Sequence, residues 1–178
     1  INANIFQETW RMVVRARETR SVFLSIMGIS WFWLTGATFL SQFPNFSKIL
    51  LGGDASVVTL LMVTFSLGIG IGSYWCTRLL KGEVSAKYVP LSALALTGFT
   101  LDLYFASRGL HAPTSGLMTA TDFINSPANW RILFDLTAIA VCGGLYTVPL
   151  YAILQNDSDP TTRSRTIAAN NILNALFM

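Results

Sequence analysis

The fold is decided by an apolar run that carries no charged residue, ASVVTLLMVTFSLGIGIGSYWCT (residues 55–77). A helix needs about 20 mostly apolar residues to cross the hydrocarbon core of a bilayer. Three further apolar runs, with at most one charged residue each, predict spans at about 21–43, 88–107 and 132–155. At about 1.5 Å of rise per residue, each run reaches roughly the 30 Å thickness of that core. The sequence therefore predicts an all-α, polytopic helical bundle in a membrane.

The composition of the 178-residue chain supports this class. Hydrophobic residues make up 52% of the chain and charged residues only 12%, whereas a soluble domain carries about 25% charged residues. This balance excludes a disordered chain and argues against a soluble globule. Two cysteines are too few for a disulfide-rich secreted scaffold.

The connections and the end of the chain complete this organisation. Turn-forming residues predict loops at 44–54, 78–87, 108–131 and 156–165. A fifth apolar helix is expected from Thr166, and it is still running at Met178. Because half a span in lipid is costly, we expect residues 21–178 to be a partial transmembrane domain of a longer protein.

The twelve Lys and Arg residues divide unequally between the two sides of the predicted bundle. Three of them, Lys48, Arg108 and Arg131, fall on one side. The other nine fall on the opposite side: Arg11, Arg15, Arg17, Arg20, Arg78, Lys81, Lys87, Arg163 and Arg165. Because cationic loops stay in the cytoplasm, the N-terminus and the loops 78–87 and 156–165 are expected there.

Residues 1–20 precede the first span and place Phe6, Trp10, Val13 and Val14 at helical spacing. This pattern is typical of an amphipathic helix that lies along the inner membrane surface. A plain juxtamembrane linker is the alternative.

Polar residues inside the spans are the candidates for a site. Ser30, Thr35 and Thr38 can return a hydrogen bond to their own helix. Trp33, in the same run, either packs in the core or lines a cavity.

The fifth helix opens with three asparagines, Asn170, Asn171 and Asn174. Their carboxamides should face protein or a wet cavity rather than lipid. Hydrogen bonding between helices and direct contact with a substrate are both consistent with this placement.

Glycines and a proline predict how the helices pack and bend. Gly68 and Gly72 are four residues apart, and with Gly70 nearby they predict a close-packing face between helices. Gly143 and Gly144 precede Pro149, which frees a backbone carbonyl, and the three residues make a candidate hinge.

Asp102 and Asp135 are the ionisable residues inside the predicted spans. Charge within a membrane is rare and often functional, so both are candidates for proton or ion coupling. Asp135 also lies four residues after Arg131, and Asp102 lies six before Arg108. An interfacial ion pair, or a carboxylate that extends to the membrane surface, is therefore the alternative explanation.

The sequence shows no pattern of an enzyme or of a metal site. His111 is the only histidine, and Cys76 and Cys142 are isolated from each other in the sequence. No P-loop, nucleophile-elbow motif or metal-ligand spacing is present. We expect no catalytic residue, no metal, no cofactor and no nucleic-acid partner for these residues.

Three segments carry a family resemblance: SWFWLTGAT (30–38), GGLYTVPLYAILQ (143–155) and RSRTIAANNILNALFM (163–178). They resemble the C-terminal half of major facilitator superfamily transporters, in particular the bacterial lysophospholipid transporter group. The resemblance implies that the spans are helices seven to ten and that Thr166 begins the eleventh. Residues 1–20 would then end the central cytoplasmic loop.

The resemblance also implies a function and a set of cavity residues. The chain would belong to a secondary transporter in the bacterial inner membrane, which moves lysophospholipid or a related amphiphile by alternating access. Its partners would be membrane lipids, that substrate and the N-terminal half of the same transporter. The implied cavity residues are Ser30, Trp33, Thr35, Thr38, Tyr146, Asn171 and Asn174.

Some features depart from this family and leave alternatives open. The family's loop motif, Gly-x-x-x-Asp-Arg-x-Gly, is matched only approximately by Gly72, Arg78, Lys81 and Gly82. The acidic residue of the motif is missing. A cation for a headgroup phosphate is expected in the outer part of the first span, where Phe39, Leu40 and Ser41 stand instead. The alternatives are the transporter portion of a bifunctional protein that also carries a glycerophospholipid acyltransferase, and a major facilitator exporter of another small molecule.

Overall fold

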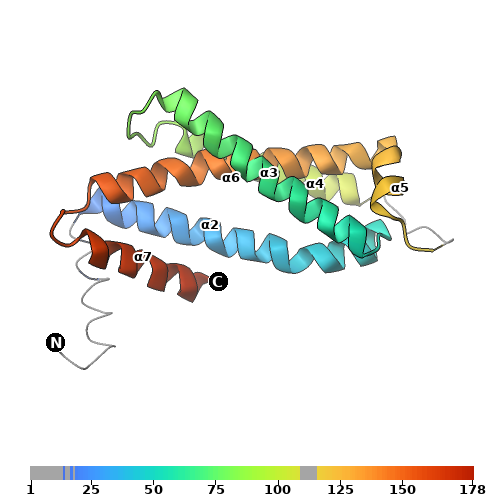
Figure 1. The fold of residues 1–178 in the computed structure, drawn as a ribbon, viewed down its shortest axis with the longest axis horizontal. Helices are drawn as coiled ribbons and strands as arrows, with labels where there is room; N and C mark the ends of the chain where they lie inside the picture. The colour runs from blue at the N-terminus through green and yellow to red at the C-terminus, as the bar shows by residue number, and fades with distance from the viewer. Residues whose placement is uncertain (1–13, 15–16, 18, 109–115) are drawn as a thin grey trace.

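The computed structural model describes residues 14, 17, 19–108 and 116–178, and every regular element in those residues is a helix (Figure 1). Four of these helical segments are long and apolar enough to cross a membrane, which confirms the predicted class: Arg20–Leu51, Ala55–Leu80, Val89–Ser107 and Pro127–Asn156. The predicted surface helix at 1–20 lies almost wholly outside the described residues.

The helices follow the predicted runs closely. In order they are α2 (Arg20–Asn45), η1 (Phe46–Leu51), α3 (Ala55–Leu80), α4 (Val89–Ser107), α5 (Ala120–Asn125), η2 (Pro127–Asn129), α6 (Trp130–Asn156) and α7 (Arg163–Phe177). The fifth long helix, α7, begins three residues before the predicted Thr166.

The prediction of a loop over 44–54 is wrong for most of its length. Pro44 lies in the last turn of α2, where the helix continues directly into the π-helical turn η1. The chain leaves the helix only at Gly52, whose positive φ of 65° suits a residue without a side chain.

The bundle has two ends with different content (Figure 1). At the end that we name the basic end, α2 and α7 begin and α3 and α6 finish. The opposite end, named the α5 end, carries η1, α5 and η2. The described cations Arg20, Arg78, Lys81, Arg163 and Arg165 belong to elements or turns of the basic end, in agreement with the division expected from the sequence.

At the α5 end, the turn before α3 is held by hydrogen bonds. The Asp54 carboxylate caps α3 by accepting from the backbone N–H groups of Ser56 and Val57. The hydrogen bond from the Ser56 hydroxyl is the main reason that the pKa of Asp54 lies below its ordinary value. The backbone of Met118 pairs with Gly52 and Asp54, which docks the segment before α5 onto this turn.

Helix α6 is the centre of the bundle, and it packs against α2, α3, α4 and α7. Its contact with α3 depends on glycines. A Cβ atom placed on Gly72 would lie 2.1 Å from the Val141 carbonyl oxygen, and one on Gly144 would lie 2.6 Å from the Ile69 carbonyl oxygen. The backbones of α3 and α6 therefore touch directly, which confirms the predicted close-packing face.

The other glycines of this pattern have different surroundings. A Cβ on Gly68 would lie 2.5 Å from Ala140 Cβ, whereas one on Gly70 would meet no atom within 4 Å. Only one side of the Gly68–Gly72 turn is thus used for packing, as expected for residues four apart on a helix.

Helix α6 runs unbroken through Pro149 from Trp130 to Asn156. Gly143 packs against the Phe32 ring of α2, and Gly144 packs against α3. Both glycines thus have a packing role in this conformation. The proposed hinge at Gly143, Gly144 and Pro149 stays a prediction.

Two apolar clusters fill the bundle. The larger cluster lies toward the α5 end and joins α2, η1, α3, α4, α5 and α6: Phe43, Leu51, Val57, Leu61, Phe65, Leu103, Phe123, Ile132, Leu136, Ile139 and Ala140. The smaller cluster lies toward the basic end: Val22, Ile26, Ile29, Leu150 and Leu154.

Replacing Gly72 with alanine tests the contact between α3 and α6. The added methyl group collides with backbone, which cannot rotate away as a side chain can. We expect the free energy of unfolding in detergent to fall by about 1–3 kcal/mol, the usual cost of overpacking. Gly70→Ala, on the same helix with open space around it, is the matched control and should be neutral or mildly stabilising. Equal effects of the two variants would contradict the close contact.

Candidate binding site between the helices

The predicted polar residues form pairs between helices rather than one cluster. Ser30 on α2 is fully buried, and its hydroxyl donates to Asn174 Oδ1 on α7 at 2.8 Å. This bond joins two helices that lie side by side near the basic end (Figure 1). Of the two roles considered for the asparagines, Asn174 takes the role of hydrogen bonding between helices.

A second pair involves an aromatic residue that the sequence did not single out. The Trp33 indole N–H donates to the Tyr151 hydroxyl on α6 at 2.9 Å. Five residues before Tyr151, the Tyr146 hydroxyl donates to the Gly28 carbonyl oxygen on α2 at 3.3 Å. Only the position of Tyr151 in the same segment as Tyr146 could have suggested its role.

The two threonines of α2 make local bonds, as their spacing predicts. Thr35 and Thr38 each donate to the carbonyl oxygen four residues earlier, at 2.8 Å, on Trp31 and Leu34 respectively. Neither hydroxyl is used to reach another helix, so neither adds to the Ser30–Asn174 contact.

The other two asparagines differ sharply in exposure. Asn170 is fully buried, and its Oδ1 atom has no hydrogen-bond partner, while its Nδ2 atom donates to Asn171 Oδ1 at 3.4 Å. Asn171 itself is exposed. Its amide is therefore available to a molecule or a protein segment that covers this face of α7.

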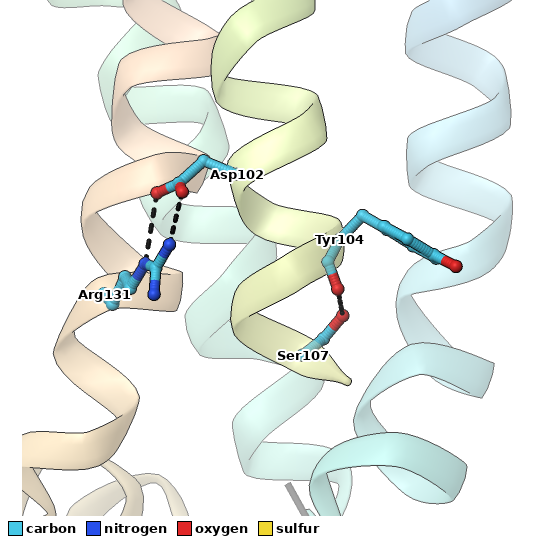
Figure 2. Close-up of polar contacts among 4 residues, drawn as sticks. All are labelled: Asp102, Tyr104, Ser107 and Arg131. Atoms are coloured by element: carbon cyan, nitrogen blue, oxygen red, sulfur yellow. Dashed lines mark hydrogen bonds and ion pairs between the residues drawn. The ribbon is translucent and has the colours of Figure 1, made fainter. Parts of the chain in front are cut away.

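An ion pair joins α4 to α6, and spacing along the sequence does not predict which residues form it. The Arg131 guanidinium donates two hydrogen bonds to Asp102, one of them from Nε to Oδ2 at 3.1 Å (Figure 2). The ion pair considered for Asp102 is thus present, but its cation is Arg131 on another helix rather than the nearby Arg108. Asp135 is fully buried, with no hydrogen-bond partner on either oxygen.

The bundle contains a cavity of about 250 Å³ near the α5 end. It lies between the second half of α2, η1, the end of α4 and the beginning of α6. Its walls are mostly apolar: Phe39, Gln42, Phe43, Phe46, Leu50, Thr100, Leu103, Tyr104, Ser107, Ile132 and Leu136. We name it the α2–α4 cavity. None of the seven residues implied by the family resemblance lines it.

One stripe of α2 nevertheless connects the cavity with the predicted residues. Thr35 precedes Phe39 by four residues, Gln42 by seven and Phe46 by eleven. Residues at this spacing share one face of a helix. The face of Thr35 therefore continues directly into the cavity wall.

The polar groups of the cavity lie where they can orient an occupant. The Ser107 hydroxyl is satisfied by the Tyr104 carbonyl oxygen at 2.9 Å, and Thr100 by Leu96 at 2.8 Å. Among the described residues, neither the Gln42 amide nor the Tyr104 hydroxyl has a hydrogen-bond partner. Figure 2 shows the Tyr104 ring directed toward α2, away from the Asp102–Arg131 pair on the other side of α4.

Arg108 lies beside Tyr104, which lines the α2–α4 cavity. The Arg108 guanidinium carbon lies 5.4 Å from the centre of the Tyr104 ring. This distance is within the range of a cation–π contact. Arg108 is exposed, so its charge is accessible to an anionic group.

Cysteines and metal ligands add nothing to these sites. Cys76 and Cys142 are buried free thiols on α3 and α6. Among residues 14, 17, 19–108 and 116–178, no group of three or more His, Cys, Asp or Glu side chains could hold a metal ion. His111 lies outside the described residues.

No family model, curated protein or solved structure matches the chain.

A double-mutant cycle tests the bond between α2 and α7. Ser30→Ala and Asn174→Ala should each destabilise the bundle, and the double variant should lose less than the sum. The expected coupling is about 0.6 kcal/mol, the average for a hydrogen bond between membrane helices, measured as the free energy of unfolding in detergent. The cycle of Ser30→Ala with Asn171→Ala is the control and should show no coupling. Additive effects of Ser30→Ala and Asn174→Ala would contradict the bond.

Proposed function

We propose that the chain is part of a secondary transporter that moves lysophospholipid, or a related single-chain amphiphile, across the bacterial inner membrane. The three segments that resemble the C-terminal half of the major facilitator superfamily support this function. In such transporters two halves rock around a site near the bilayer midplane. The N-terminal half of the same transporter would then cover the exposed faces of α2 and α7.

The observation that carries the proposal is the α2–α4 cavity. Its walls are apolar and belong to helices long enough to span a membrane. Its volume of about 250 Å³ is below the range of roughly 300–1,000 Å³ typical of pockets for drug-sized ligands. A cavity of this size and chemistry suits part of one acyl chain better than a bulky polar solute.

The polar residues at the wall of the α2–α4 cavity favour an amphiphilic substrate over a plain hydrocarbon. Gln42 and Tyr104 can donate hydrogen bonds to a glycerol backbone. Arg108, beside the Tyr104 ring, supplies a cation for a phosphate group. This arrangement offers the cation that the outer part of the first span lacks.

The charge distribution supports an orientation for this transporter. If the basic end faces the cytoplasm, as the excess of cations favours, the α2–α4 cavity lies on the opposite side of the membrane. Substrate would then enter the cavity from the outer leaflet and would leave on the side of phospholipid metabolism in the cytoplasm. Trp33, Tyr146 and Asn171 belong to helices that run toward the basic end, and we propose them as further contacts for the substrate there.

Blocking the cavity tests the proposal. Gln42 is exposed at the cavity wall, so Gln42→Trp should fill the mouth without disturbing the core. We expect uptake of lysophospholipid, by vesicles that contain the full-length protein, to fall about tenfold, which corresponds to about 1.4 kcal/mol.

Leu40→Trp is the matched control for this experiment. Leu40 is on the same helix, is 43% exposed and does not line the cavity. Its variant should transport at nearly the wild-type rate. Equal uptake by the Gln42→Trp and Leu40→Trp variants would contradict a role for the cavity in transport.

A further inference from the structure

Asp135 on α6 is a carboxyl group in an unusual place. It lies within a predicted span, has no exposed surface, and its side-chain oxygens accept no hydrogen bond from the described residues. An ionised carboxylate there would have lost its water without gaining a bond in return. Burial of such a charge is so costly that the group takes up a proton instead.

Two charged residues act on Asp135. Arg131 precedes it by four residues, about one turn, on α6, and Asp102, the partner of Arg131, lies on α4. The two hydrogen bonds from Arg131 go to Asp102 (Figure 2). A negative charge on Asp135 would therefore be repelled by Asp102 while the nearest cation is already paired.

The other described elements around this part of α6 meet it with apolar side chains, and the acids of the α5 end, Asp54 and Asp122, are hydrogen-bonded within their own turns. Helices α2 and α3 contribute Phe43 and Phe65 to the apolar cluster that contains Leu136, the next residue after Asp135. Lys48 on η1 and Arg108 after α4, the remaining described cations of the α5 end, are exposed. Helix α7, with Arg163 and Arg165, begins at the basic end.

We propose that Asp135 is a proton-binding site, and that it forms a switch together with Asp102 and Arg131. When Asp135 is protonated, Arg131 pairs with Asp102, and this ion pair connects α6 to α4. When the Asp135 O–H bond breaks and the proton passes to water, a second carboxylate competes for Arg131. That carboxylate is on the same helix as Arg131. When Arg131 pairs with it, the ion pair with Asp102 breaks, and α4 loses this contact with α6.

This switch does not depend on the proposed substrate. It rests on the burial of Asp135 and on the ion pair, not on the α2–α4 cavity, which lies on the other side of α4 from Asp102 and Arg131. However, α4 contributes Thr100, Leu103, Tyr104 and Ser107 to the cavity wall. Proton release at Asp135 would therefore loosen a wall of that cavity.

Infrared difference spectroscopy of the full chain in lipid vesicles tests the proton site directly. At pH 6 the wild-type protein should show the carbonyl stretch of a protonated carboxylic acid, and Asp135→Asn should lack it. The asparagine side chain is neutral and of similar size, so this variant should keep the wild-type helix content. A wild-type spectrum without that band, or a band that persists in Asp135→Asn, would overturn the proposal.

Three further variants test the switch at the same pH. Asp102→Asn frees Arg131 to pair with Asp135, so the band should weaken or disappear. Arg131→Gln removes the cation, so the band should remain. Asp122→Asn on the exposed helix α5 is the matched control and should leave the band unchanged. A full band in Asp102→Asn, or loss of the band in Arg131→Gln or Asp122→Asn, would contradict the switch.

Discussion

The direct backbone contact between α3 and α6 is the constraint on which the rest of the bundle depends. Gly72 and Gly144 carry no side chain at the two points where one helix meets the backbone of the other. In a membrane, lipid competes with protein for apolar side chains, so helices associate mainly where small residues let them approach closely. Once α3 holds α6 from one side, α2 and α4 can pack against its remaining faces. Helix α6 is the most buried of the four long segments as a result.

This central position of α6 explains why both candidate sites involve it. Ile132 and Leu136 close the α2–α4 cavity, and Asp135 lies between them in the sequence. The ion pair from Arg131 reaches α4 on the side away from Tyr104 (Figure 2). One helix thus carries part of an apolar wall and part of a charged group. A small movement of α4 against α6 would change both at once.

The sequence predicted the spans well because each is a long apolar run, and length together with hydropathy is decisive in a bilayer. It also predicted the close packing at Gly68 and Gly72, since small residues four apart lie on one face. It predicted the local bonds of Thr35 and Thr38, because these involve only residues four apart on one helix.

Features that join distant segments could not be predicted in the same way. The partner of Asp102 is 29 residues away on another helix, and its identity depends on how α4 and α6 cross. The π-helical turn η1 follows Pro44, although a proline at this position predicts the start of a loop. The aromatic residues Phe39, Phe43 and Phe46 show the same spacing whether they fill a core or line a cavity. Only the arrangement of three helices distinguishes the two.

The most direct test of the account is to locate a bound amphiphile. A lysophospholipid with a photoactivatable group in its acyl chain would be crosslinked to the full protein in vesicles, and the adducts would be mapped by mass spectrometry. The account predicts adducts on the walls of the α2–α4 cavity, at residues such as Phe43, Leu103 and Tyr104, that unlabelled lysophospholipid suppresses. Adducts spread over exposed apolar positions such as Leu24, Leu67 and Leu94, without competition by unlabelled lipid, would contradict it.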